Sequence, residues 1–138
     1  MERSVAAALL MERAVRNIYE DKSSSAIQPL QWAILRYMAS AATSDARVAT
    51  IAKYLGLHHA PVSRAVATLV KRGLIEKQPG RSDLRTAPFE LTLKGRDLLK
   101  VDPILKIASQ ITLLPEGERS AFERAMRNLA LTLDYKAT

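Results

Sequence analysis

The sequence contains no cysteine among its 138 residues and only two histidines. The absence of cysteine excludes a disulfide framework, a thiol redox switch and a metal site with cysteine ligands. The two histidines, His58 and His59, are adjacent, and neighbouring side chains on a helix point about 100° apart. No further histidine is available to complete a ligand set. We therefore expect neither a metal site nor a cofactor.

Long apolar runs are also missing. No stretch approaches the roughly 20 apolar residues that a membrane-spanning helix needs. The opening segment, MERSVAAALLMERAV, has only a short apolar run with acidic residues on both sides, which is unlike a signal peptide. The hydrophobic content of 48% is enough for a core in a single domain. We therefore expect a folded cytoplasmic protein with no membrane contact.

Two motifs of enzymes are absent. The stretch PGRSD has one glycine and no GK[ST], so it is not a phosphate-binding loop. Ser63, His59 and Asp83 have the residue types of a hydrolase triad, but no nucleophile elbow or oxyanion loop accompanies them. The sequence nominates no reaction, and we expect the protein not to be an enzyme.

Positive charge is concentrated in one part of the chain. The net charge is +7, from 21 Lys and Arg against 14 Asp and Glu. Residues 58–96 carry eight basic and three acidic side chains, hence +5, whereas residues 1–57 carry +2 and residues 97–138 carry none. A local basic excess is the expected footprint of a polyanionic partner, most often nucleic acid, although a solvated basic surface would have the same composition.

This basic part overlaps a pattern of two helices and a hairpin. VATIAKYLGL predicts a helix over about residues 47–55 that ends at Gly56, and HHAPVSRAVATLVKRGLI predicts a longer helix from an N-cap at His58 to Gly73. Two helices joined by a short glycine-containing turn are typical of a helix-turn-helix. Predicted strands over 74–78 and 85–91, joined by a loop too long for a tight turn, form a projecting hairpin behind them.

The longer helix has two distinct faces. Its apolar spacing predicts a buried face of Val62, Val66, Leu69 and Val70. The opposite face begins with small and hydrogen-bonding residues, as a helix needs if it is to lie close to base edges. Its members are His59, Ser63, Arg64, Ala67, Thr68 and Lys71.

Further helices flank this segment. Apolar stripes predict helices over about 2–20 and 30–41, and Thr92 is a good N-cap for a helix that Asp102-Pro103 would kink or divide. A last helix opens near Pro115. The aromatic residues Trp32, Tyr37 and Phe122 stand on apolar stripes and are expected in the core, with the lining of a ligand cavity as the alternative.

With these motifs in view, the chain resembles the MarR family of bacterial winged-helix transcription factors over nearly its whole length. The resemblance is carried by IAKYLGL with PVSRAVATLVKRGLI, by DLR in the hairpin followed by LTLKG, and by LLPEGERSAFERAMRNL. It implies a single mainly α (α+β) domain: a winged helix-turn-helix lobe over about 29–92, and dimerisation helices over about 1–22 and 93–135. It also implies a homodimeric repressor of a palindromic DNA operator, relieved by a small-molecule effector.

The resemblance assigns DNA contacts residue by residue. Arg64 is expected to contact a base, because a bidentate Arg–guanine pair is the commonest specific contact. Ser63 and Thr68 are expected at phosphates or bridging waters. Arg85 matches the family's minor-groove arginine, and Asp83 is expected to hold its guanidinium. Arg81 and Ser82 lie at the expected wing tip, and Lys71 lies on the outer helix face.

Two departures from the family pattern stand at the start of the longer helix. His58 replaces the usual Ser or Thr cap, and the His58-His59 pair is compatible with base reading or pH sensing. Pro61 replaces a residue that is often Thr, so one usual polar contact is missing. The pair Asp83 and Arg85 also fits an ordinary surface salt bridge. The alternative function is a winged-helix protein-interaction module without specific DNA binding.

Overall fold

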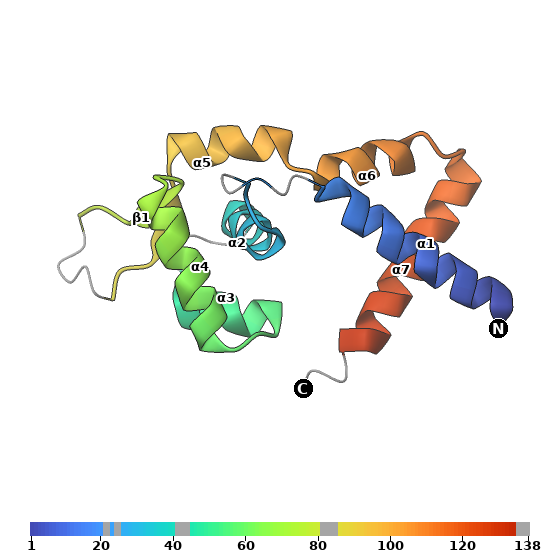
Figure 1. The fold of residues 1–138 in the computed structure, drawn as a ribbon, viewed down its shortest axis with the longest axis horizontal. Helices are drawn as coiled ribbons and strands as arrows, with labels where there is room; N and C mark the ends of the chain where they lie inside the picture. The colour runs from blue at the N-terminus through green and yellow to red at the C-terminus, as the bar shows by residue number, and fades with distance from the viewer. Residues whose placement is uncertain (21–22, 24–25, 41–44, 81–85, 135–138) are drawn as a thin grey trace. The chain divides into compact units, whose positions relative to one another are not determined.

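The computed structural model describes residues 1–20, 23, 26–40, 45–80 and 86–134. In this part of the chain the fold is mainly α with one small hairpin, which confirms the predicted fold class. The elements in order are α1 (Glu2–Ile18), α2 (Pro29–Ser40), α3 (Val48–Leu55), α4 (His59–Lys71), β1 (Ile75–Lys77), β2 (Phe89–Leu91), α5 (Leu93–Leu98), the 3-10 helix η2 (Leu99–Val101), α6 (Ile104–Thr112) and α7 (Glu116–Asp134) (Figure 1).

The elements gather into two compact units. Asp21–Asp102 form one unit, called the lobe below, and Met1–Glu20 with Pro103–Thr138 form the other, called the terminal unit. The boundary falls at Asp102-Pro103, where the predicted interruption divides the expected fifth helix into α5 with η2, which belong to the lobe, and α6. Proline lacks the N–H that a continuous helix would need there.

The core of the lobe is built around α2. Helices α3 and α4 and strand β2 pack against it (Figure 1). The sequence predicts a central position for this helix because apolar residues cover much of its surface, and the structure confirms it. Trp32 and Tyr37 are both buried, as expected, and so are Ile34, Leu35 and Met38.

Glycines end the two helices of the helix-turn-helix as predicted. Gly56 and Gly73 have φ of +67° and +73°, a left-handed conformation that costs little without a Cβ. After α4, Gly73 N–H donates to the carbonyl of Val70 at 2.9 Å and Leu74 N–H donates to that of Leu69 at 3.0 Å. This pair of bonds is a Schellman motif, which turns the chain sharply from α4 into β1.

The two strands of the hairpin are shorter than the predicted 74–78 and 85–91. Strands β1 and β2 pair antiparallel with Ile75 opposite Leu91 and Lys77 opposite Phe89. Pro88 precedes β2 and has no N–H to extend the ladder, although its carbonyl accepts from Gln78 N–H at 2.9 Å. Phe89 N–H donates to the carbonyl of Ala46 at 2.7 Å, which attaches the base of the hairpin to the chain just before α3.

The terminal unit buries little of its apolar surface in one chain. On α1 only Ile18 is buried. Phe122 is 37% exposed, so its expected core position is wrong for the isolated chain. Large apolar side chains stand exposed on all three helices: Val5, Leu9, Leu10, Met11, Val15, Leu105, Leu129, Leu131 and Leu133. None of the described helices is long and apolar enough to cross a membrane.

Candidate nucleic-acid interface

Helix α4 packs on the lobe through one narrow stripe. Val62, Ala65, Val66 and Leu69 are buried, at the i, i+3, i+4, i+7 spacing of a single helix face. The prediction of Val70 as buried is wrong, because this side chain is 42% exposed. Val70 follows Leu69 by one residue and therefore points about 100° away from the stripe.

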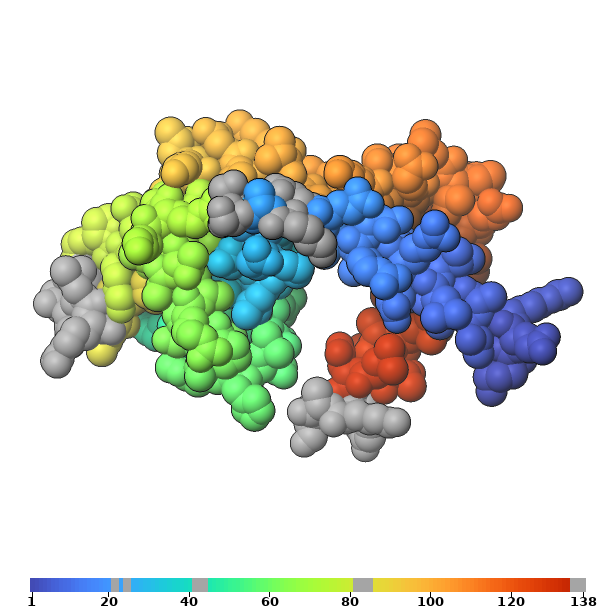
Figure 2. Space-filling model, viewed as in Figure 1, coloured from blue at the N-terminus to red at the C-terminus, as the bar shows by residue number. Residues whose placement is uncertain are grey.

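The opposite face of α4 is open to solvent. His59, Arg64, Ala67, Thr68 and Lys71 are exposed, while Ser63 and Pro61 are half-buried. The α4 segment, green in Figure 2, lies at the surface of the lobe in that view. The Thr68 hydroxyl donates to the carbonyl of Arg64 at 3.1 Å, which holds it close to the helix backbone. The structure therefore brings the predicted helix residues onto one surface, with Arg64 and Lys71 as its cations.

The start of α4 departs from the usual helix cap. His58 occupies the N-cap position, as predicted, with extended backbone and no side-chain cap bond. Pro61 stands in the first turn, where its missing N–H costs little. His58 and His59 are both exposed. In the described part of the chain, no group of three or more His, Cys, Asp or Glu side chains could hold a metal ion.

The predicted wing-tip contacts Arg81, Ser82, Asp83 and Arg85 lie outside the described residues. The base of the hairpin is described, and it carries contacts that the sequence did not indicate. Arg47 Nε donates to the carbonyl of Thr86 at 2.9 Å. Lys77 Nζ lies 4.8 Å from the ring centroid of Phe89, a cation–π contact. Arg47 and Thr86 are 39 residues apart, so only the folded chain reveals this anchor of the returning strand.

The C-terminus of α4 is joined to the N-terminus of α5. Lys94 Nζ donates to the carbonyl of Arg72 at 2.9 Å, and Thr92 Oγ1 donates to the carbonyl of Gly73 at 2.6 Å. The same Thr92 hydroxyl accepts from Gly95 N–H at 3.1 Å, which confirms Thr92 as the N-cap of α5. Thr92 thus bridges the end of one helix and the beginning of the next.

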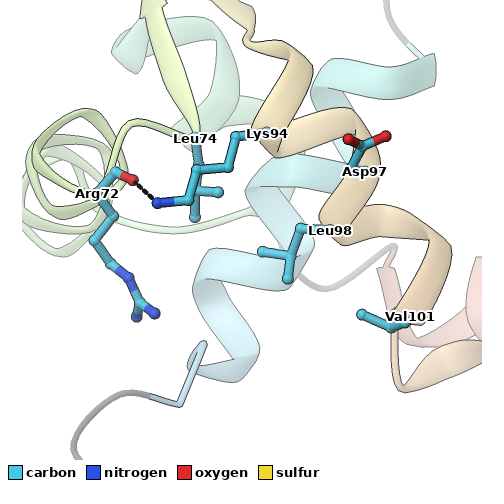
Figure 3. Close-up of a pocket in the computed structure, with 6 residues that line it drawn as sticks. All are labelled: Arg72, Leu74, Lys94, Asp97, Leu98 and Val101. Atoms are coloured by element: carbon cyan, nitrogen blue, oxygen red, sulfur yellow. Dashed lines mark hydrogen bonds between the residues drawn. The ribbon is translucent and has the colours of Figure 1, made fainter.

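A cavity of about 320 Å³ opens beside this junction (Figure 3). The aliphatic stems of Leu74, Leu98 and Val101 line it, and the Lys94 side chain reaches across toward the Arg72 backbone. A second cavity, of about 410 Å³, lies within the terminal unit and is lined mainly by apolar residues of α1, α6 and α7, including Phe122.

An ion pair holds Asp102, the last residue of the lobe, against α2. Arg36 of α2 makes a bidentate pair with Asp102, with Nε–Oδ2 at 2.7 Å and Nη2–Oδ1 at 2.6 Å. The Asp102 side chain is only 5% exposed, and the guanidinium gives its carboxylate two charge-assisted hydrogen bonds. The pair attaches the end of η2 to the central helix of the lobe.

Tyr37, in the core of the lobe, packs on Tyr54 of α3 with ring centroids 4.7 Å apart. Burial, in the first place, raises the pKa of the Tyr37 hydroxyl above its usual 10.0. The negative charge of Asp45 and the neighbouring Tyr54 hydroxyl raise this pKa further. Tyr54 itself is largely exposed, so the pair joins the core to the outer side of α3.

The sequence and the fold of this chain were compared with those of known proteins. Residues 27–86, which contain the helix-turn-helix, match the model of the MarR family. No curated protein matches the chain by sequence. Among solved structures, the MarR family transcription regulator SP03579 matches with a TM-score of 0.73 at 19% identity, covering 99% of this chain and 91% of that one.

Two structures of MepR from S. aureus also match. MepR bound to ethidium bromide has a TM-score of 0.62 at 18% identity, covering 94% of this chain and 95% of its own. A mutant of MepR bound to an oligodeoxyribonucleotide has a TM-score of 0.63 at 19% identity, covering 95% and 97%. These likenesses establish the fold over nearly the whole length. Together with the family model on residues 27–86, they make this chain similar in fold to the MarR family of winged-helix transcription regulators.

Proposed function

We propose that this protein is a sequence-specific double-stranded DNA-binding regulator that acts as a homodimeric repressor of a palindromic operator. The observation that carries the proposal is the exposed polar face of α4, which presents Arg64 and Lys71 while the other face of the helix is sealed in the lobe core. The major groove of B-DNA, about 12 Å wide, admits one α-helix and presents a distinct pattern for each base pair. An exposed helix of this kind is the shape and charge that the groove accepts.

Each exposed side chain has a proposed role. Arg64 contacts a base edge, since its long side chain is exposed near the middle of the helix. Ser63, Thr68 and Lys71 contact phosphates or bridging waters, which position the helix without reading sequence. His59 lies at the positive end of the helix dipole, where backbone N–H groups favour a phosphate. The wing residues Arg81, Ser82, Asp83 and Arg85 are proposed to serve the adjacent minor groove.

The terminal unit supports the proposed dimer. Its exposed apolar side chains on α1, α6 and α7 would cost about 25 cal/mol for each Å² of apolar surface left in water. A second copy that covers them recovers that free energy and places two α4 helices on one DNA. Two-fold symmetry then predicts half-sites about one helical turn, roughly 34–36 Å, apart. Sedimentation that shows a stable monomer at micromolar concentration would contradict the dimer.

Relief by a small molecule is the second part of the proposal. MepR binds ethidium in a fold that this chain shares. The cavity beside the α4–α5 junction supports the idea, because a ligand there would touch residues that hold the recognition helix. Such a ligand acts only if its affinity differs between the DNA-bound and free arrangements. The check is whether a bound ligand weakens operator binding by the same factor by which operator DNA weakens ligand binding.

The decisive test is selection of bound sites from random DNA by the full chain. A palindromic motif with the expected spacing supports the proposal, whereas equal binding to all sequences contradicts it. On the selected site, Arg64→Ala is expected to cost about 1–3 kcal/mol and to relax discrimination at one base position. Arg96→Ala is the matched control, because it removes an exposed arginine of the same lobe from α5 rather than from α4.

The rival function is a protein-interaction module without specific DNA binding, and salt separates the two. If several phosphates are neutralised, log K falls linearly with log salt with a slope of about −0.9 for each phosphate contacted. A flat response, together with a loss of sequence preference, would favour the rival.

A further inference from the structure

The LTLKG segment does more than begin a helix: it holds the end of the recognition helix. The carbonyls of Arg72, the C-cap of α4, and of Gly73 and Leu74 follow one another between the end of α4 and the start of β1. Each accepts a hydrogen bond from the segment Thr92–Gly95. Lys94 Nζ donates to the first at 2.9 Å, Thr92 Oγ1 to the second at 2.6 Å, and Thr92 N–H to the third at 3.1 Å.

The fourth contact of the segment is steric. Gly95 is buried and lies against the backbone of Leu74, so that a Cβ in its place would overlap the Leu74 carbonyl oxygen and lie 3.1 Å from the carbonyl carbon. Only glycine allows this approach. The Thr92 hydroxyl donates to the carbonyl of Gly73, just past the C-cap of α4, and accepts from Gly95 N–H within α5. A single hydroxyl therefore fixes the ends of both helices.

The charge of Lys94 suits its place. The C-terminus of a helix carries a partial negative charge, and an ammonium group there is stabilising. Lys94 comes from another element and reaches the α4 terminus across the edge of the cavity seen in Figure 3. The Schellman bonds of Gly73 and Leu74 set the local turn of the chain, whereas the contacts of residues 92–95 relate α4 to α5.

We propose that Thr92, Lys94 and Gly95 form a latch that sets the orientation of the recognition helix, with Lys94 as a positioning residue for DNA reading that makes no DNA contact itself. This inference rests on the proposed function, because it assigns α4 to the major groove. A base contact fails when a side chain is misplaced by about 1 Å, so a small rotation of α4 is expected to affect specific binding far more than binding to random DNA.

The test measures the affinities of the full chain for its selected site and for random DNA, each over a range of salt. Lys94→Met removes the ammonium and keeps the aliphatic stem, and Lys94→Arg is the conservative rescue. Lys100→Met is the matched control, because this exposed lysine is close in sequence and, among the described residues, pairs with the exposed Asp97.

For Lys94→Met we expect specific affinity to fall about threefold to tenfold, the equivalent of one lost hydrogen bond. Affinity for random DNA and the salt slope should remain as in the wild type, and Lys94→Arg should recover most of the discrimination. A direct phosphate contact would instead lower both affinities together and reduce the salt slope by about 1, which would overturn the latch. Equal effects of Lys94→Met and Lys100→Met would overturn it as well.

A second measurement tests the latch without DNA and therefore independently of the proposed function. Amide hydrogen exchange without DNA reports the protection of the last turn of α4 and of Leu74. Thr92→Val, which removes the hydroxyl while keeping the shape of the side chain, should speed exchange there at least several-fold, and Thr92→Ser should restore protection. If the wild type binds no specific DNA but exchange behaves in this way, the latch stands and the assigned DNA function fails. Unchanged exchange in Thr92→Val overturns the latch.

Discussion

The replacement of Gly95 by alanine tests the close approach of α5 to the backbone of Leu74. A Cβ at this position overlaps the Leu74 carbonyl oxygen and lies 3.3 Å from Leu91 Cδ2. The obstacle is a backbone carbonyl rather than the tip of a flexible side chain, so α5 must move away from the start of β1. We therefore expect Gly95→Ala to destabilise the lobe.

Three contributions set the size of the effect. Overpacking in a well-packed site costs about 1–3 kcal/mol. The displacement also strains or breaks the two hydrogen bonds by which Thr92 holds the carbonyls of Gly73 and Leu74, each worth about 0.5–1.5 kcal/mol. Alanine returns up to about 1 kcal/mol through its better helix propensity. The net expectation is a loss of about 1–4 kcal/mol in the free energy of unfolding.

The assay is urea denaturation followed by far-UV circular dichroism, at one protein concentration for all variants because the proposed self-association would contribute to stability. Gly117→Ala is the control, because nothing lies within 4 Å of an added Cβ at that position in α7. It should be neutral or stabilising by up to about 1 kcal/mol. If Gly95→Ala is as stable as the wild type or more so, the close approach to Leu74 does not exist in solution.

Three further predictions concern the ion pair, the buried tyrosine and the apolar face of the terminal unit. Arg36→Met leaves the Asp102 carboxylate buried without its guanidinium and should cost about 2–4 kcal/mol by urea denaturation, whereas Lys100→Met, which removes an exposed pair, should cost less than about 1 kcal/mol. The pKa of Tyr37 is raised above 10.0 in the folded state, so its contribution to stability is complete below pH 10.0 and is lost as the pH rises through the folded-state pKa. Stability measured across this range should therefore fall less steeply in Tyr37→Phe, and identical profiles would contradict the raised pKa. Leu129→Asp places a charge on the exposed apolar face of α7 and should weaken self-association at least about tenfold in sedimentation experiments, and an unchanged dimer would place the interface elsewhere.

Helix-capping residues and apolar periodicity in the sequence predict much of the fold. Gly56, Gly73 and Thr92 were predicted as helix ends from residue type alone, and all three serve as such in the structure. These predictions succeed because a cap or a left-handed turn depends on a few neighbouring residues. The central position of α2 is equally predictable from the sequence, because a helix that is apolar over most of its surface is expected to be buried on several sides.

Predictions that depend on distant packing were less accurate. Val70 and Phe122 are apolar and belong to stripes that the sequence predicts as buried, yet both are substantially exposed in the single chain. Helical periodicity locates a stripe to within about one residue, or 100°, which is enough to misplace Val70. For Phe122 the pattern identifies an apolar face correctly but does not say whether this chain or a second copy covers it.

Residue types and short spacings are enough to predict the fold class and the candidate surface: they indicate the helix-turn-helix pattern, the basic excess over residues 58–96 and the outward-facing residues of α4. The tertiary structure alone decided how that helix is held. The bonds from Lys94 and Thr92 to the end of α4, the attachment of Arg47 to Thr86, and the Arg36–Asp102 pair join residues 19 to 66 positions apart. Periodicity and propensity describe one element at a time, whereas these contacts exist only after separate elements have packed together.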